Sequence, residues 1–303
     1  MNYICDRLKE VLKDNPWTEM AQKLEKAMKD NPTALSGRFV LEQDEVVLNR
    51  FGSLLGNDIS HLLLNLPPQP FIGSPNAMIW ILQFNPGYSK TIDSFDYLGE
   101  NNLPKHDYHK NKTVSSLKER IDLLCSQYRF ENKEFYALTP SFHTFRKGFR
   151  KGYDRGAYLW YQESLFPRKD GCFTFVAEQK RERFCRDNIF VIEFFPYHSK
   201  AFNFNIFPFL PSFEFWRRLI HYGFKKNKIM LCHGLQSKNS VTASVLASIE
   251  GFEAAVKNGY IHSVVLPGKG RSRLILKRNA VTPIKKGTTL FRSFCEKVRN
   301  KYR

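Results

Sequence analysis

The sequence predicts an α/β fold: a three-layer, doubly wound, mainly parallel sheet with helices on both faces and an N-terminal helical cap. Three observations support this prediction. Short, continuously apolar runs at 77–84, 188–195 and 228–232 are typical of strands buried on both faces. Helical patterns alternate with these runs, and a Pro or Gly follows each run closely. A chain of 303 residues is long enough for such a sheet and a smaller cap.

The first predicted unit is the helical cap, residues 1–66, to which we assign no chemistry of its own. Apolar residues recur at helical spacing in its first thirty residues or so. Asn31-Pro32 breaks the second helix, because the residue before a proline is disfavoured in helical backbone. A further helical pattern covers Val40–Leu66 and stops at Pro67-Pro68.

The second predicted unit is the α/β domain, residues 67–303, with a long basic insertion at about 99–187. Residues 89–187 are irregular apart from a helix at Val114–Tyr128. An amphipathic helix is predicted at Ser212–Tyr222, with Ser212 as its N-cap and Gly223 as its stop. The remaining predicted elements are a helix at Val241–Ala255, strands at His262–Leu266 and Ser272–Lys277, and a last helix from about Thr288 to Tyr302.

The charge balance points to a polyanionic partner. The chain has 47 Lys and Arg against 29 Asp and Glu, a net charge of +18, and such an excess attracts DNA or an anionic membrane surface. No apolar stretch approaches the roughly 18 residues of a membrane span. Charged residues interrupt Met1–Lys13, so it does not resemble a signal peptide. We therefore expect DNA as the partner, no membrane, and a monomer in the cytoplasm or at the nucleoid.

The six cysteines form no C-x-x-C pair and no cluster with zinc spacing. We expect reduced, mostly buried thiols, no metal, no iron–sulfur cluster and no small-molecule cofactor.

The sharpest local signal is Asn85-Pro86-Gly87, which ends the apolar run at 77–84. Pro and Gly force a turn there, so Asn85 is held at the carboxyl end of a central strand, where ligands bind in open α/β sheets. An amide does not titrate in the useful range, but it can accept a hydrogen bond from a water and hold it in line. The alternative role for Asn85 is to cap the turn.

Four segments together resemble one family. They are Asn85-Pro86-Gly87, the strand at Phe190–Phe195, the strand and turn at Ile229–Gly234, and Leu276–Pro283 with the helix behind it. This pattern resembles the uracil-DNA glycosylase superfamily, and is nearest to its mismatch-specific and single-strand-selective branches. The resemblance covers about residues 67–98 and 188–302, and it is specific at the first motif and loose elsewhere.

The resemblance implies a monofunctional DNA glycosylase that flips a modified or damaged base and hydrolyses its N-glycosidic bond, leaving an abasic site. Asn85 is then the catalytic residue. No lysine is clearly poised as a Schiff-base nucleophile, so no lyase step is expected. The setting is base-excision repair or defence against foreign DNA with modified bases.

The chain also departs from the family. Arg278-Asn279-Ala280-Val281 stands where the family usually carries His-Pro-Ser-Pro, so no histidine is in place there to stabilise a departing base anion. The first motif lacks the Asp of uracil-specific members, and Glu193 stands where those members carry Asn.

Glu193 suggests which base is read. A carboxylate only accepts hydrogen bonds, which suits the exocyclic amine of cytosine and repels the O4 carbonyl of uracil. We therefore predict a cytosine-type base; the alternative is a structural salt bridge from Glu193 to an Arg or Lys. Further base-contacting candidates, each with a core role as its alternative, are Phe84, Tyr88, Tyr97, Phe195, Tyr197 and His198.

Two basic regions are predicted to grip DNA. His143–Arg155 interleaves aromatic and basic residues, and Lys269–Arg303 holds twelve Lys or Arg against one acidic residue. The alternative is a solvated helix face. The predicted DNA contacts are Arg146, Lys147, Arg150, Lys151, Ser199, Lys200, Lys269, Arg271, Arg278 and Asn279.

Two other functions remain open at this point. A non-catalytic nucleic-acid-binding relative on the same fold would keep the basic surface and lose turnover. A metal-dependent nuclease would need clustered carboxylates, and the spacing of Asp93, Asp96 and Glu193 is not compelling.

Overall fold

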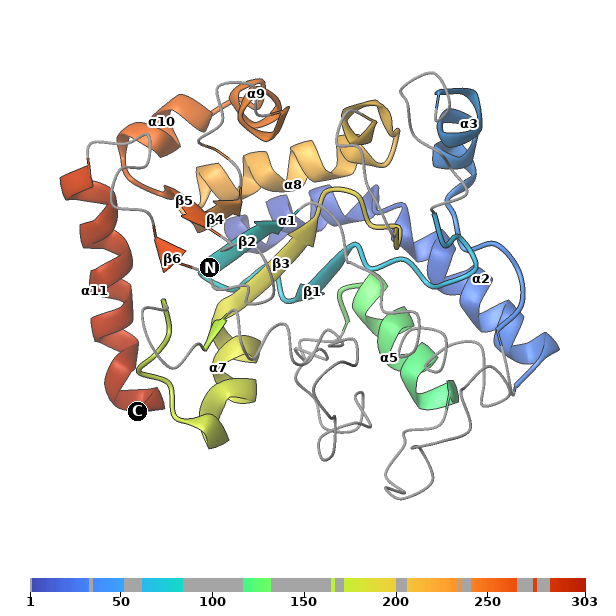
Figure 1. Ribbon diagram of the computed structural model, residues 1–303, viewed down its shortest axis with the longest axis horizontal. Coiled ribbons are helices and arrows are strands. Elements are labelled where there is room, and N and C mark those ends of the chain that lie inside the picture. The colour runs from blue at the N-terminus through green and yellow to red at the C-terminus, as the bar shows by residue number, and fades with distance from the viewer. Residues whose placement is uncertain are drawn as a thin grey trace.

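A mixed sheet lies at the centre of the molecule, which is described here from a computed structural model (Figure 1). The described residues are 2–32, 35–51, 62–83, 117–131, 165–166, 172–199, 206–233, 235, 241–265, 275–276 and 284–303. Within these residues the sheet has six strands, which are β1 (Phe71–Gly73), β2 (Ile79–Gln83), β3 (Ile189–Glu193), β4 (Ile229–His233), β5 (Ile261–Val265) and β6 (Ile275–Leu276).

The strand order is β1-β3-β2-β4-β5-β6. Strands β3, β2, β4 and β5 run parallel to one another, whereas β1 and β6 pair antiparallel at either end of this order. The predicted α/β fold with a mainly parallel sheet is therefore confirmed, and the three apolar runs correspond to β2, β3 and β4. Strand β1 was not predicted, because three residues carry no readable alternation.

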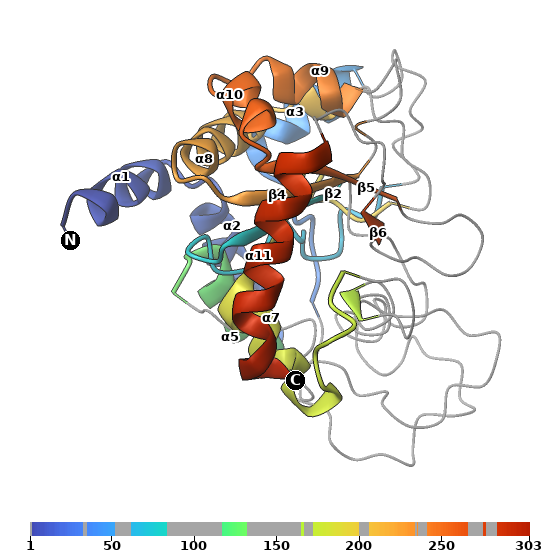
Figure 2. The ribbon, with the colours of Figure 1, turned by 90° about the vertical axis from the view of Figure 1, so that its left-hand side faces the viewer.

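Helices lie on both sides of the sheet (Figures 1 and 2): α8, α9 and α10 on one side, and α7 on the other. Helix α5 packs against α2 beside the outer strand β1. The described helices are α1 (Asn2–Lys13), α2 (Trp17–Asp30), α3 (Glu42–Phe51), α5 (Leu117–Tyr128), α7 (Arg181–Asn188), α8 (Phe213–Lys225), α9 (Val241–Ala247), α10 (Phe252–Lys257) and α11 (Ile284–Tyr302), with 3-10 turns η4 (Glu178–Lys180) and η5 (Phe207–Phe209).

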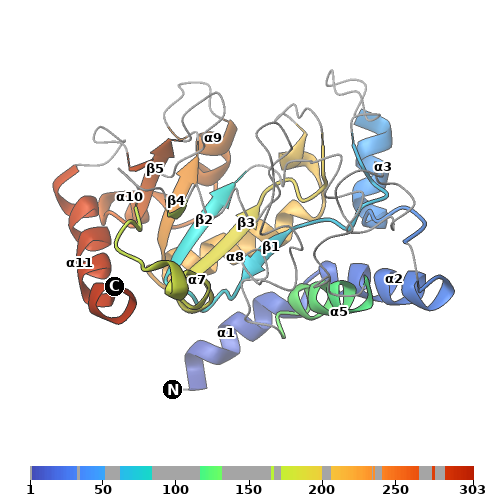
Figure 3. The ribbon, with the colours of Figure 1, turned by 60° about the horizontal axis from the view of Figure 1, so that its bottom comes forward.

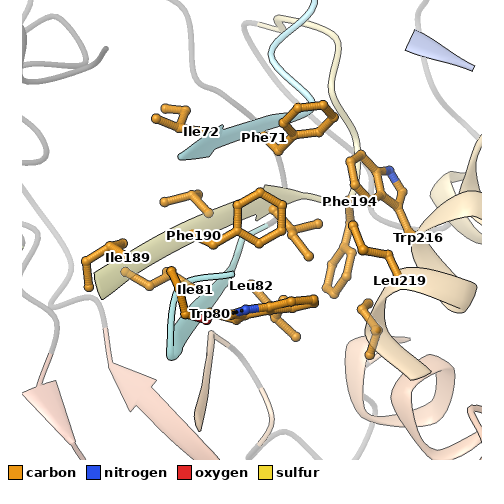
Figure 4. Close-up of a cluster of buried hydrophobic side chains, with 14 of the residues drawn as sticks. Phe71, Ile72, Trp80, Ile81, Leu82, Ile189, Phe190, Phe194, Trp216 and Leu219 are labelled. Atoms are coloured by element: carbon orange, nitrogen blue, oxygen red, sulfur yellow. Dashed lines mark hydrogen bonds between the residues drawn. The ribbon is translucent and has the colours of Figure 1, made fainter. Parts of the chain in front are cut away.

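Aromatic rings fill the space between the sheet and α8 (Figure 4). Trp80 of β2 meets Phe190 of β3 edge-on with ring centroids 5.1 Å apart, and Phe71 of β1 meets Trp216 of α8 at 5.7 Å. All four side chains are buried. Burying such large rings supplies much of the hydrophobic stabilisation, and it fixes which face of each strand points towards α8.

The prediction that α8 ends at Gly223 is wrong, since the helix continues to Lys225. A Cβ built on Gly223 would come within 2.5 Å of Met230 Cε and 3.0 Å of Trp80 Cζ3. Glycine therefore allows close approach of α8 to the sheet rather than ending the helix. Ser212 occupies the predicted N-cap position but makes no side-chain cap hydrogen bond.

Two other helices differ from their predictions. The predicted helix at 241–255 is broken into α9 and α10, because Gly251 adopts φ +91° just before Phe252. Helix α7 was not predicted, because its sequence RERFCRDN is charged and buries few apolar side chains, Phe184 and Cys185.

The N-terminal helices pack onto the same hydrophobic core as the sheet. The Trp17 ring of α2 lies 6.3 Å from the Tyr128 ring and 6.4 Å from the Trp216 ring. Helix α2 ends at Asp30, so the predicted break at Asn31-Pro32 is confirmed. The domain boundary at 66 stays a prediction.

The helical pattern predicted for Val40–Leu66 holds for α3 but is wrong at its end. Leu62 forms an antiparallel bridge with Ser199, and the Leu63 backbone N–H donates to the His198 carbonyl at 2.9 Å. The backbone hydrogen bonds of this segment are thus made across to another segment rather than within a helix.

Candidate functional site

The carboxyl ends of β2 and β4 mark the point where the strand order reverses (Figure 3). The chain passes from β2 to β3 on one side and then crosses to β4 on the other side of β2. In doubly wound sheets the crevice outside the carboxyl ends at such a switch point is where ligands bind. Strand β2 ends at Gln83, so the predicted turn Asn85-Pro86-Gly87 follows directly from this point.

Two polar side chains leave the sheet side by side at this edge. Gln83 of β2 is in parallel register with Glu193 of β3, so the two share one face of the sheet at the strand spacing of about 4.8 Å. Trp80 and Phe190, which pack towards α8, are also in register with each other, three positions earlier. Because side chains alternate along a strand, Gln83 and Glu193 point to the opposite face from α8.

Neither polar group is satisfied within the described part of the chain. The Nε2 of Gln83 and the Oε2 of Glu193 are both buried, and neither has a hydrogen-bond partner there. The Glu193 residue is 2% exposed. Leaving a buried polar group unpaired costs about 1–3 kcal/mol, so this pair is expensive for the fold to keep.

The electrostatics of Glu193 follow from its burial, which raises the pKa of this carboxyl well above its ordinary value. No ion pair reaches Glu193 among the described residues, so the structural salt bridge has no support there. A neutral carboxylic acid keeps an acceptor oxygen and gains an O–H donor. The neutral acid could therefore also donate to O4 of uracil, so the prediction of a cytosine-type base applies to the carboxylate form of Glu193.

The predicted site residue Tyr197 lies in the interior. Its hydroxyl donates to Asp44 Oδ2 at 2.8 Å and accepts from the Leu41 backbone N–H at 3.2 Å. The Ser212 backbone N–H donates to the other oxygen of Asp44 at 2.9 Å. This network joins the N-terminal segment to the chain after β3 and to the start of α8.

Three more predicted residues also lie in the interior. The Phe195 ring meets the Tyr197 ring edge-on at 5.5 Å. His198 Nε2 lies 3.1 Å from the Pro67 carbonyl oxygen, and Ser199 pairs with Leu62. All three are buried, so in this structure they pack the segment after β3 rather than face an open surface.

Many of the predicted site residues lie outside the described residues. For base recognition and catalysis these are Phe84, Asn85, Tyr88 and Tyr97. For DNA contact they are Arg146, Lys147, Arg150, Lys151, Lys200, Lys269, Arg271, Arg278 and Asn279. The carboxylates Asp93 and Asp96 of the nuclease alternative also lie outside.

The sequence analysis missed Gln83. A polar residue closing an otherwise apolar strand was its signal, since Met78–Leu82 is apolar and Gln83 comes directly before the Asn85 motif. Register was the missing information, because only strand pairing puts residues 110 positions apart beside each other.

The described part of the basic region Lys269–Arg303 consists of β6, α11 and Arg303. Asp187 of α7 accepts from Lys301 at 3.0 Å and from Tyr302 at 2.6 Å, which ties α7 to α11. Exposed basic residues of α11 are Arg292, Lys297, Arg299 and Lys301, and the exposed Arg303 follows it. This helix thus presents positive charge to solvent, as both the DNA-contact and the solvated-face interpretations require.

Comparison of the chain with protein-family models, with curated proteins and with solved structures gave no match. Among the helices that the structure describes, none has the length and apolarity needed to cross a membrane. Four of the cysteines, Cys125, Cys185, Cys232 and Cys295, are buried free thiols, in line with the sequence.

Proposed function

We propose that this protein is a monofunctional DNA glycosylase, which extrudes a modified or damaged cytosine-type base from DNA and hydrolyses its N-glycosidic bond. One observation carries the proposal: β2 ends at Gln83 at the topological switch point, two positions before Asn85 in the sequence, and the buried Glu193 of β3 is in register with Gln83. The Oε2 of Glu193 has no hydrogen-bond partner among the described residues. A flipped base needs buried polar groups to read its edge, and this edge of the sheet supplies them.

The reaction needs three things from the protein. A water must be aimed at C1′ of the deoxyribose, the positive charge that develops on the sugar must be tolerated, and the base must be held as it departs. In the proposal, Asn85 orients the water. The C1′–N bond breaks with its electron pair going to the base, the water oxygen bonds to C1′, and its proton passes to solvent or to the base. The products are the free base and an abasic site.

The positive charge of the chain supports DNA as the substrate, since it matches a polyanion. In this proposal the protein acts as a monomer, without a cofactor, in the cytoplasm or at the nucleoid. Its setting is base-excision repair or defence against foreign DNA that carries modified bases.

The test is base release from oligonucleotides that carry a single uracil, cytosine, 5-methylcytosine or 5-hydroxymethylcytosine, as single strands and as duplexes. Released base is measured by mass spectrometry, and abasic sites are measured by cleavage in alkali. We expect release of a cytosine-type base. We expect Asn85→Ala to lose about 100-fold or more in rate while still binding DNA, because a misplaced reactant costs that much.

Asn76→Ala is the matched control, because Asn76 is an exposed asparagine just before the amino end of the same strand. Its rate should equal that of the wild type. Uracil as the best substrate would contradict the cytosine-type assignment. Binding without any base release would favour the non-catalytic relative, and scission that requires Mg²⁺ but no alkali would favour a nuclease.

A further inference from the structure

Two neighbouring groups at the carboxyl edge could bond to each other and do not. Gln83 Nε2 is a donor and Glu193 Oε2 can accept, and their residues are paired in register on adjacent strands. Both atoms are nevertheless buried without a partner in the described ranges. A hydrogen bond between them would satisfy both groups at once.

Another buried glutamine shows how this fold treats a structural amide. Gln127 of α5 donates from Nε2 to the Gly73 carbonyl at 2.8 Å and accepts from the Gly73 N–H at 3.3 Å. Its amide therefore completes the hydrogen bonding of strand β1. Gln83 does nothing of this kind with Nε2, so its amide is left for a third partner.

The chemistry of that partner follows from the polarity of the pair. A donor beside an acceptor matches the N3–N4 edge of cytosine, where ring N3 accepts and the N4 amino group donates. Uracil presents the reverse pattern, with N3–H as a donor and O4 as an acceptor. The carboxyl of Glu193 has an oxygen to accept from N4 in either form, but only the carboxylate, which has no O–H to donate to O4, rejects uracil. The preference therefore requires Glu193 to be ionised when the base is bound.

We infer that Gln83 and Glu193 act together as one donor–acceptor pair that reads the N3–N4 edge of an extruded cytosine-type base. In this pair Gln83 donates to ring N3 and Glu193 accepts from the N4 amino group. The inference rests on the proposed function, and it adds Gln83 as a specificity-determining residue.

A first experiment measures the melting temperature of Gln83→Met, Glu193→Met and the control Gln127→Met. Methionine keeps the side-chain length and removes the polar atoms. If the pair is kept for a ligand, Q83M and E193M should each raise the melting temperature by about 2–5 °C, because an unpaired buried group is removed. Q127M should lower it, because Gly73 loses both of its partners.

A second experiment measures the dissociation constants of single-stranded oligonucleotides that carry 2′-fluoro-2′-deoxycytidine or 2′-fluoro-2′-deoxyuridine, whose glycosidic bonds resist hydrolysis. The wild type should bind the cytidine probe about tenfold or more tightly than the uridine probe. Glu193→Gln should reduce that ratio towards one, because an amide N–H can donate to O4. Q83M should also reduce it, and Q127M should leave it unchanged.

The outcomes separate this inference from the proposed function. Equal binding of both probes by the wild type, or a lower melting temperature with an unchanged ratio in Q83M, overturns the pair. Absence of base release from any substrate, together with a cytidine preference that depends on Gln83, overturns the enzyme and keeps the pair.

Discussion

Asp44 and Glu193 are two buried carboxyl groups that the fold treats in opposite ways. Both are at most 2% exposed. Asp44 is held on both oxygens, by the Tyr197 hydroxyl and the Ser212 backbone N–H. Glu193 keeps Oε2 unpaired among the described residues, next to an equally unpaired Gln83 Nε2.

The difference shows that burial alone does not tell a structural carboxyl from a candidate binding carboxyl. Burial raises the pKa of both carboxyls, and the hydrogen bonds from Ser212 and Tyr197 oppose the shift at Asp44. A perturbed pKa therefore marks both the structural and the functional candidate. Hydrogen bonding distinguishes these two groups, because Asp44 is paired within the protein whereas Glu193 Oε2 has no partner among the described residues.

The largest expected effect is on the Asp44 side of the comparison. Asp44→Leu leaves the Tyr197 hydroxyl and the Ser212 N–H without an acceptor, so we expect a loss of about 2–5 kcal/mol in the free energy of unfolding. Denaturant titration measures it. Asp44→Asn, which keeps an acceptor oxygen for Ser212, should lose less. A D44L variant as stable as the wild type would remove the distinction between the two carboxyls.

The next effect concerns pH on the Glu193 side. The folded-state pKa of Glu193 is raised, so the folded state holds its proton at pH values where the unfolded chain, with a pKa of about 4.3, has released it. Wild-type stability contributed by this group is thus fully present below that value and falls as pH rises towards the folded-state pKa. The stability advantage of E193M should therefore grow between pH 4 and pH 8. An advantage that shrinks with pH would mean that Glu193 is ionised and paired.

The smallest effect is expected at a surface carboxyl, Asp187. Burial raises its pKa, but hydrogen bonds from Tyr302 and Lys301 outweigh this and lower it below the ordinary value. Asp187→Asn should cost about 0.5–1 kcal/mol at neutral pH, as surface ion pairs do. The stability that Asp187 contributes is present above the unfolded-state pKa and lost as pH falls through the lower folded-state pKa. Unfolding titrations at pH 3 and pH 7 check this, and equal costs at both would contradict it.

Much of the fold follows from local sequence patterns. The apolar runs that form β2, β3 and β4 could be recognised in the sequence, because strands buried on both faces are almost continuously apolar. Elements without such a pattern were not predicted, since α7 is too charged and β1 is too short to show one. Gly223 was predicted to end the helix, because the sequence does not reveal that Trp80 and Met230 lie too close to this position for a larger side chain.

The sequence by itself determined the class of fold and the excess of positive charge, because apolar periodicity and charge are properties of residue types. Its Asn85 motif marked the carboxyl end of one strand. Only the tertiary structure decided that Tyr197 and His198 face inward and that Gln83 and Glu193 stand side by side. The physical reason is that a hydrogen-bond partner and a strand register are relations between distant residues, which exist only once the chain has folded.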